Sequence, residues 1–251
     1  MSAKPWPEGT GCRILQEVDS TNAEARRLAP TLSGPEWILA HRQTTGRGRR
    51  GRPWANPVGN FTATLVMQPG ETPDKVALRS FVASLALFDA FVAATGRVAL
   101  FALKWPNDVL LNGGKVAGIL LESAGAGGTL SHFCIGIGVN LVAAPSRSDV
   151  DESAITPVDL QSETGARVTP EEFLDLLAPA FADWEAQFST YGFAPIRQAW
   201  LNRAAKIGEV ITARTGKESV VGTFETIDDT GALVLKTASG RRVISAAEVF
   251  F

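Results

Sequence analysis

Residues 97–123 read RVALFALKWPNDVLLNGGKVAGILLES, and this stretch predicts the central strands of a β-sheet. Two apolar runs flank Asn112-Gly113, a dipeptide that is the strongest short-range signal for a β-hairpin. A third apolar run precedes them and ends just before a Trp-Pro pair. We therefore expect a strand followed by a hairpin, with Asn107 and Asp108 at the start of the hairpin.

Outside this stretch, the spacing of apolar residues predicts the remaining elements. Thr21 and Glu24 have the spacing of a capping box, which predicts the start of a helix. Pro73 and Gly96 bracket a long Ala/Leu/Phe-rich run, as at the two ends of a buried helix. Residues 143–169 have the composition of a loop. Further strands are predicted at residues 12–18, 36–41, 60–67 and 130–141, and further helices at 170–190 and 194–205.

The pattern changes at about Lys206, where short strands begin to alternate with tight polar turns. Such spacing is typical of a small antiparallel barrel. We therefore predict two domains, at residues 1–205 and 206–251. The expected fold class is α+β, with a mixed or antiparallel sheet backed by helices and followed by a small β-barrel.

The composition is that of a globular protein with a sizeable core. Of the 251 residues, 45% are hydrophobic, and the net charge of −2 does not favour a protein whose main task is to bind nucleic acid. We see no run of about 20 apolar residues and no apolar core of a secretory signal, so a cytoplasmic protein without a membrane partner is expected. Cys12 and Cys134 lack metal-ligand spacing, and both are expected to be buried thiols.

Residues 42–54, RQTTGRGRRGRPW, concentrate positive charge in a glycine-containing loop, with five arginines and three glycines in the first 11 positions. Glycines let a backbone approach a ligand closely, and arginines match phosphate and carboxylate oxygens. The loop therefore suits a polyanion whose α-phosphate is attacked. A solvated basic loop or an RNA contact is the alternative. A P-loop is excluded because no Gly-Lys-Ser/Thr follows the glycines.

Together with four other motifs, this loop resembles the glycine/arginine signature of biotin–protein ligases. The other four stand in the family's order and are Asp19-Ser20-Thr21-Asn22, Lys104-Trp105-Pro106-Asn107-Asp108, Gly114-Lys115-Val116-Ala117-Gly118-Ile119-Leu120 and Gly136-Ile137-Gly138-Val139-Asn140. The resemblance implies a catalytic domain similar to class II aminoacyl-tRNA synthetases with a C-terminal SH3-like barrel. Only 18 residues precede Asp19, so we expect the class without an N-terminal DNA-binding domain.

The resemblance implies a ligase with ATP and biotin as substrates and Mg²⁺ as cofactor. Biotin would first become biotinyl-5′-AMP and then pass to one lysine of a biotin carboxyl carrier protein domain, in acetyl-CoA carboxylase or a related carboxylase. The resemblance also implies a homodimer, which nothing in the sequence itself fixes. No nucleic acid partner is expected.

The resemblance places the biotin site largely in the early motifs. Ser20 and Thr21 would bind the ureido head of biotin, although both also suit the cap of a helix. Gln43 carries an amide that can donate to and accept from the same head, and a glycine at position 118 lets a strand approach the ring. The implied biotin-binding residues are Ser20, Thr21, Asn22, Gln43, Gly46, Arg47, Lys115 and Gly118.

A second set is implied for ATP and its adenylate: Arg47, Arg49, Arg50, Arg52, Trp54, Asn107, Lys115 and Asn140. Lys115, Arg47 and Arg49 are the expected catalytic residues because their charge would offset that developing on phosphorus. Lys115 could instead be a surface residue at a strand edge, and Trp54 a core residue. Asp108 is the candidate metal ligand and the candidate for easing deprotonation of the acceptor lysine, although an Asn-Asp pair also suits a turn.

Other assignments fit less well. We expect no side-chain nucleophile, and neither His41 nor His132 receives a catalytic role. The closest rival function is a lipoate ligase or octanoyl transferase, which would carry an Arg-Arg-x-Ser-Gly-Gly-Gly loop or a catalytic cysteine, and neither is present. Ala246-Ala247 stands where a glycine before the glutamate is more usual in the family, which bears on the contacts of the C-terminal domain.

Overall fold

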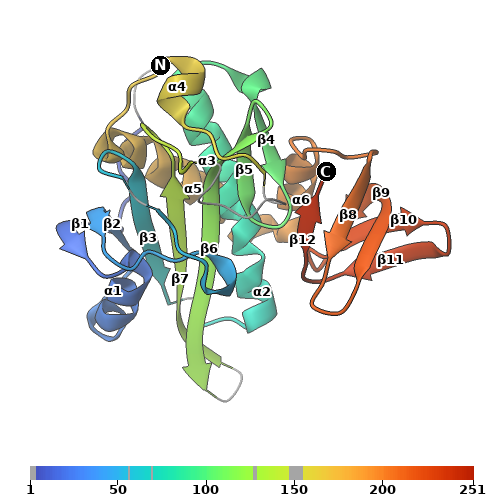
Figure 1. Ribbon diagram of the computed structural model, residues 1–251. Coiled ribbons are helices and arrows are strands. Elements are labelled where there is room, and N and C mark those ends of the chain that lie inside the picture. The colour runs from blue at the N-terminus through green and yellow to red at the C-terminus, as the bar shows by residue number, and fades with distance from the viewer. Residues whose placement is uncertain (1–3, 56, 69, 127–128, 147–154) are drawn as a thin grey trace.

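The computed structural model describes residues 4–55, 57–68, 70–126, 129–146 and 155–251. Its larger part is a seven-stranded sheet in the order β1-β2-β3-β7-β6-β5-β4 (Figure 1). The pairing of β1 with β2 is parallel and the other pairings in this sheet are antiparallel. The strands are β1 (Gly11–Val18), β2 (Glu36–Gln43), β3 (Phe61–Met67), β4 (Phe101–Lys104), β5 (Asp108–Leu111), β6 (Gly114–Ala126) and β7 (Thr129–Val139).

The predicted hairpin is confirmed as β5 and β6. Asn112 and Gly113 have φ values of 49° and 81°, and a tight hairpin turn with two positive φ angles favours this dipeptide. The strand before it is shorter than expected, because Val98–Leu100 forms a 3₁₀ helix and β4 begins only at Phe101.

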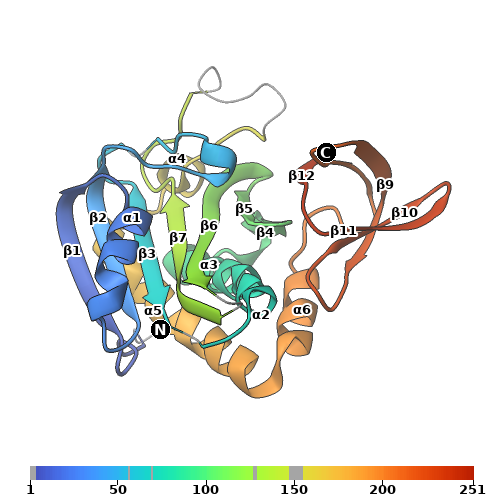
Figure 2. The same cartoon turned by 90° about the horizontal axis from the view of Figure 1, so that it is seen from below.

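Helices cover the two faces of the sheet unequally. On one face, α3 and α5 pack as a layer, and Figure 2 shows α5 running behind the strands. On the other face, α1 covers a small apolar cluster that includes Ile38, Val66 and Cys134. The α-helices are α1 (Thr21–Leu28), α2 (Pro73–Ala77), α3 (Arg79–Thr95), α4 (Leu160–Thr164), α5 (Pro170–Tyr191) and α6 (Phe193–Leu201), and the 3₁₀ helices are η1 (Ala29–Thr31), η2 (Arg49–Gly51) and η3 (Val98–Leu100).

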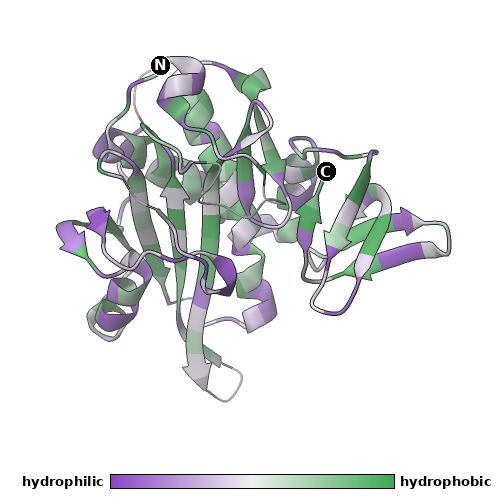
Figure 3. Ribbon diagram, viewed as in Figure 1, coloured by the Kyte–Doolittle hydropathy of each residue, from purple (hydrophilic) through white to green (hydrophobic). Residues whose placement is uncertain are grey.

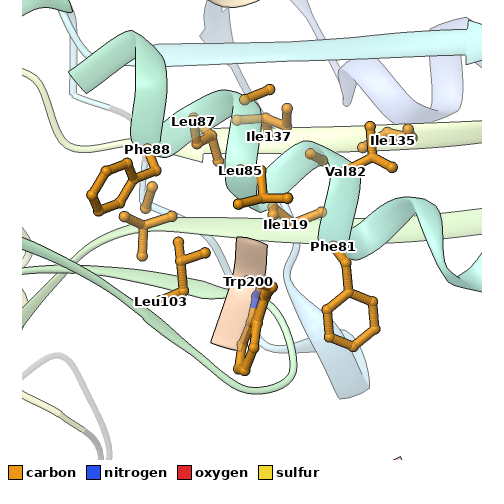
Figure 4. Packing of buried hydrophobic residues seen from close by; sticks show 14 of the residues in the cluster. Phe81, Val82, Leu85, Leu87, Phe88, Leu103, Ile119, Ile135, Ile137 and Trp200 are labelled. Carbon is orange, nitrogen blue, oxygen red and sulfur yellow. The ribbon is translucent and has the colours of Figure 1, made fainter. Parts of the chain in front are cut away.

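The main core lies between the sheet and α3. Side chains of α3 such as Val82 and Leu85 face Ile119 of β6 and Ile135 and Ile137 of β7 (Figure 4). The strands in the middle of the sheet are accordingly coloured mainly as hydrophobic or neutral in Figure 3. The predicted end of this helix is confirmed, since Gly96 adopts a left-handed φ of 69° after Thr95.

The C-terminal residues form a separate antiparallel sheet, in the order β11-β10-β9-β8-β12. It is attached to the larger part by side-chain hydrogen bonds: Trp105 Nε1 donates to the carbonyl of Gly231 at 3.0 Å, and Arg197 Nε donates to that of Ile227 at 2.5 Å. The strands are β8 (Val210–Arg214), β9 (Ser219–Ile227), β10 (Leu233–Thr237), β11 (Gly240–Ile244) and β12 (Glu248–Phe250).

Two local predictions are wrong. The helix at Thr21 forms, but its N-cap is Ser20, and neither Ser20 nor Thr21 caps it through a side chain, because Thr21 instead donates to Gln43. Of the predicted loop 143–169, residues 147–154 lie outside the described residues. The described remainder is not loop throughout, since Asp159 accepts a hydrogen bond from the backbone of Ser162 and begins α4.

Two expectations drawn from composition also need correction. Cys12 is exposed on the edge strand β1, whereas Cys134 is buried as expected. The 23-residue segment Pro73–Thr95 is in fact long and apolar enough to cross a membrane, by length and composition only. Its most apolar window is 67% buried inside the fold, as befits the helix at the centre of the core.

Arg79 joins the helical layer through a buried charge cluster. Its side chain is only 4% exposed, and Nε and Nη2 donate to the carboxylate of Glu185 on α5 at 3.0 and 2.7 Å. A third nitrogen, Nη1, donates to Glu71 at 2.5 Å, and the guanidinium lies 4.9 Å from the ring centre of Phe188. Such a buried cluster holds α3 and α5 in register.

We predict that Arg79→Ala lowers the free energy of unfolding by about 3–5 kcal/mol, because it leaves the carboxylates of Glu185 and Glu71 without their buried partner. Urea denaturation followed by circular dichroism measures this. Lys75→Ala is the matched control, since Lys75 also pairs with Glu71 but is 52% exposed, and should change stability by less than about 0.5 kcal/mol. Equal effects of the two substitutions would show that the cluster does not hold the helices.

We also predict that iodoacetamide at pH 8 alkylates the native protein at Cys12 alone. Partial burial also raises the pKa of the Cys12 thiol, so its reaction is slow, but Cys12 is exposed. Cys134 is buried and burial raises its pKa to about 12, so it is neither accessible nor ionised. Peptide mass spectrometry before and after unfolding in urea identifies the modified residues. Rapid modification of Cys134 in the folded protein would contradict its burial.

Candidate functional site

A cleft of about 830 Å³ opens on the face of the sheet that α1 covers only in part. Its floor is set by the strand register: Thr62 of β3 lies opposite Gly138 of β7, which lies opposite Gly118 of β6. The same row continues through Asp108 of β5 to Lys104 of β4. Because residues in register share one face, these five positions all point toward the cleft.

The structure brings together nearly all the residues that the sequence singled out. Arg50 is the exception, since it is not among the described residues that line the cleft. The predicted residues that do line it are Ser20, Thr21, Asn22, Gln43, Gly46, Arg47, Arg49, Arg52, Trp54, Asn107, Asp108, Lys115, Gly118 and Asn140.

Glycines let two side chains lie directly against the floor. A Cβ built on Gly138 would fall 2.4 Å from Cε2 of Trp54, and one on Gly118 would fall 3.3 Å from Cζ3 of the same ring. A Cβ on Gly136 would fall 2.3 Å from Oδ1 of Asn22. The indole of Trp54 therefore rests on the bare backbone of β6 and β7, inside the cleft.

A chain of polar side chains runs under one end of the cleft. Gln43 Oε1 accepts from the backbone N–H of Thr21 at 2.8 Å and from its hydroxyl at 3.1 Å. Thr64 lies beneath, with its Oγ1 2.8 Å from that of Thr21, and donates to Asn22 Oδ1 at 2.6 Å. Thr21, Asn22 and Thr64 are all buried. The residues that line this end of the cleft are therefore uncharged and already hydrogen-bonded to one another.

Four of the five arginines of the loop are held by partners from three different places in the chain. Arg47 Nη2 contacts Glu122 of β6 at 3.2 Å, and Arg49 Nη1 donates to Asn107 Oδ1 at 3.1 Å. The remaining two pairs join the loop to the C-terminal sheet: Glu248 of β12 lies 2.9 Å from Arg50 and 2.5 Å from Arg52.

Sequence reasoning missed both carboxylates. Glu122 lies four residues after Gly118 in the same predicted strand, and side chains of a strand alternate between its two faces. This spacing places Glu122 on the same face as Gly118, so the sequence did contain a signal for it. Glu248 had no such signal, because only the docking of the second sheet brings it to the loop.

A compact group of charges lies beside the arginines. Lys115 Nζ lies 2.7 Å from Asp108 Oδ1, and Lys104 Nζ lies 3.6 Å from Oδ2. Burial by itself would raise the pKa of Asp108, but Lys115 and Lys104 hold that pKa below its ordinary value. Burial lowers the pKa of Lys104. Asp108 therefore stays ionised and orients Lys115, whose Nζ also lies 5.7 Å from the ring centre of Trp54.

Two predicted ligand contacts are partly occupied within the protein. Asn107 uses Nδ2 to donate to Ile119 O at 2.7 Å while its Oδ1 accepts from Arg49. Asn140 Nδ2 donates to Val158 O at 3.0 Å. In the described part of the chain, no three His, Cys, Asp or Glu side chains gather in a way that could hold a metal ion. The two lysines beside Asp108 would compete with any cation for its carboxylate.

Most residues that line the cleft belong to a segment that matches a known family. Residues 12–140 match the biotin/lipoate A/B protein ligase family, and residues 206–251 match the biotin protein ligase C-terminal domain. The chain is 60% identical over 238 residues to a biotin–[acetyl-CoA-carboxylase] ligase of Paracoccus denitrificans, a match that covers 95% of this chain and 99% of that protein. A bifunctional ligase/repressor of Bacillus subtilis is 31% identical, with 92% of this chain and 71% of that protein covered.

A solved structure is also similar over nearly the whole chain. It is the biotin protein ligase from Aquifex aeolicus in complex with biotin and ATP, at a TM-score of 0.79 and 26% identity. The match covers 95% of this chain and 97% of that one, so both sheets and the cleft between the loop and β6 fall within it.

We predict that Gly138→Ala displaces the indole of Trp54 from the floor, because the new Cβ would lie 2.4 Å from a ring atom. Fluorine NMR of protein labelled with 5-fluorotryptophan should show the Trp54 resonance shifted, once it is assigned with Trp54→Phe. Gly216→Ala is the control, since a Cβ there meets no atom within 4 Å. An unshifted Trp54 resonance in Gly138→Ala would contradict the packing described above.

Proposed function

Because this chain belongs to the biotin/lipoate A/B protein ligase family, we propose that it is a biotin protein ligase working through the cleft described above. It joins biotin to ATP as biotinyl-5′-AMP and then transfers biotin to one lysine of a biotin carboxyl carrier domain of acetyl-CoA carboxylase or a related carboxylase. The observation that carries the proposal is convergence: residues from five separated motifs line one cleft, at which a neutral, hydrogen-bonded end adjoins a strongly cationic one.

The neutral end suits the ureido head of biotin. The side-chain carbonyl of Gln43 accepts from Thr21, so the two Nε2 hydrogens remain as donors for the ureido oxygen. Ser20, the N-cap residue of α1 beside Thr21, also lines the cleft. Gly118 leaves room for the bicyclic ring against β6, provided that Trp54 moves away or covers the ring from above. Asn22 and Gly46 shape this end.

The cationic end suits the carboxylate of biotin and the phosphates of ATP. In the first step, an oxygen of the biotin carboxylate attacks the α-phosphorus, the new P–O bond forms, and pyrophosphate leaves. Lys115, Arg47 and Arg49 offset the negative charge that develops on phosphorus, in a site that is already partly withdrawn from water. Asp108 keeps the Lys115 ammonium in place. Positioning and charge supply the catalysis, so no side-chain nucleophile is required.

In the second step, the amine of the carrier lysine attacks the carbonyl carbon of the mixed anhydride, the amide C–N bond forms and AMP leaves. The attacking amine must lose a proton. We assign Asp108 mainly to orienting Lys115, because the two lysines that hold its pKa low also make it a weak base.

Mg²⁺ would enter bound to the phosphates of ATP, since this ion keeps most of its water ligands and takes few from protein. Trp54 and Asn140 are the proposed adenine contacts, the latter through Oδ1. Arg50 and Arg52 can bind the phosphates only if they first break their ion pairs with Glu248.

We further propose the division of the chain into a catalytic domain, 1–205, and a C-terminal domain, 206–251. A homodimer remains an implication of the family resemblance, and a cytoplasmic location remains a prediction from the sequence.

The test is to mix the protein with biotin and Mg-ATP and to look for biotinyl-5′-AMP and pyrophosphate, by mass spectrometry and a coupled assay. A biotinyl domain is then added, and a single biotin should appear on it. Lipoate runs in parallel. Activation of lipoate in place of biotin would favour the rival ligase, and a folded protein that activates neither acid but binds RNA would overturn the proposal.

We predict that Lys115→Ala lowers the rate of adenylate formation at least about 100-fold, which is the usual cost of removing one charge-stabilising donor. The variant should keep its fold, because Lys115 is 30% exposed and its loss leaves Asp108 paired with Lys104. Lys75→Ala, on α2 away from the cleft, should keep the full rate. A Lys115→Ala variant with the rate of the unmodified protein would remove this residue from the catalytic set.

A further inference from the structure

Glu122 of β6 contacts one residue at each end of the cleft. Its Oε2 accepts from Asn22 Nδ2 at 2.7 Å, and both carboxylate oxygens lie 3.2 Å from Arg47 Nη2. Asn22 and Arg47 line the cleft, whereas Glu122 lies outside its described lining. The carboxylate therefore contacts one residue of the neutral end and one of the cationic end without facing the ligand itself.

The register of the sheet explains this position. Glu122 pairs with Cys134 of β7, one alternation beyond the pairing of Leu120 with Gly136. It therefore points to the same face of the sheet as the cleft. Gly136 has no side chain, and this leaves the space through which Asn22 reaches down to the carboxylate.

Through Glu122, the loop is attached to the protein at two points by one continuous network. The first attachment is Gln43, which accepts from the backbone N–H of Thr21. The hydroxyl of Thr21 lies 2.8 Å from that of Thr64, which donates to Asn22. Asn22 then donates to Glu122, which also accepts from Arg47 of the loop. Its middle members are buried, where linked hydrogen bonds strengthen one another and lose strength together when one is removed.

The geometry also leaves Arg47 able to bind an anion. In the part of the chain that the structure describes, its side-chain hydrogen bonds run from Nη2 alone, so Nε and Nη1 stay available to a ligand. A carboxylate behind the guanidinium fixes the direction of those donors. An exposed Arg–Glu pair contributes little to stability by itself. This carboxylate, however, also accepts a hydrogen bond from Asn22, which is only 3% exposed.

We propose that Glu122 is a positioning residue that couples the biotin end of the cleft to Arg47, so that occupation of one end orders the other for its ligand. The inference rests on the proposed function, since it takes biotin and ATP as the two ligands. Coupling of this kind is reciprocal: whatever factor biotin adds to nucleotide affinity, the nucleotide adds to biotin affinity.

The experiment measures that factor by isothermal titration calorimetry. Biotin is titrated into the protein with and without saturating α,β-methylene-ATP and Mg²⁺, an analogue whose bridging carbon prevents adenylate formation. In the unmodified protein we expect the analogue to raise biotin affinity at least about fivefold. In Glu122→Gln, which keeps the size of the side chain and an acceptor for Asn22 but removes the charge, the factor should fall below about twofold.

Glu17→Gln is the matched control. Glu17 also belongs to a strand of the same sheet and pairs with an arginine, Arg42, at 2.8 Å, but both side chains are more than half exposed and neither lines the cleft. It should keep the full factor. The loop should stay folded without Glu122, because its backbone bonds to itself, from Trp54 N to Gly46 O and from Gly48 N to Arg52 O. If Glu122→Gln nevertheless fails to fold, Glu122→Asp, which keeps the charge but falls one methylene short, takes its place.

The outcomes separate the two proposals. A protein that neither binds biotin nor makes biotinyl-5′-AMP would overturn the proposed function. A protein that does both, with no coupling or with coupling that survives in Glu122→Gln, would overturn only the role of Glu122. Loss of coupling in Glu122→Gln together with its retention in Glu17→Gln supports it.

Discussion

The bare backbone of two neighbouring strands is the constraint on which the cleft depends. In β7, Gly136 and Gly138 alternate with Ile135 and Ile137, so one face of the strand fills the core while the other carries no side chain. The close contacts of Trp54 and Asn22 at these glycines show how little space there is. A side chain at either glycine would push the polar network or the indole out of position, and the cleft would lose its floor.

Beside that floor, the loop brings Arg47, Arg49, Arg50 and Arg52 together, and their mutual repulsion has to be offset. Glu122, Asn107 and Glu248 each take one or two of them, so the charges are separated and aimed before any anion arrives. Lys115 is held by Asp108 in the same manner. The cationic end of the cleft is thus arranged in advance, as charge stabilisation of a transition state requires. The C-terminal sheet takes part in this arrangement, because Glu248 of its strand β12 holds Arg50 and Arg52.

The parts of the fold that could be predicted are those with a local physical cause. Asn112-Gly113 specifies a turn because few other residues accept two positive φ angles, and Gly96 ends α3 for the same reason. The errors arise where a distant partner competes with the local signal. Thr21 has capping-box spacing, but Gln43, 22 residues away, takes its hydroxyl. Cys12 belongs to an apolar-looking strand, but that strand lies at the edge of the sheet and is exposed.

The sequence by itself determined the family, the order of most strands and helices, and the identity of most residues around the cleft, because motifs and turns are written in short segments. Only the tertiary structure decided which partners those residues have. Arg50 lies against Glu248 and outside the lining, Asn107 supports Arg49, and Glu122 joins Asn22 to Arg47. These pairings link residues from 58 to 198 positions apart, which only the register of one sheet and the docking of a second can bring together.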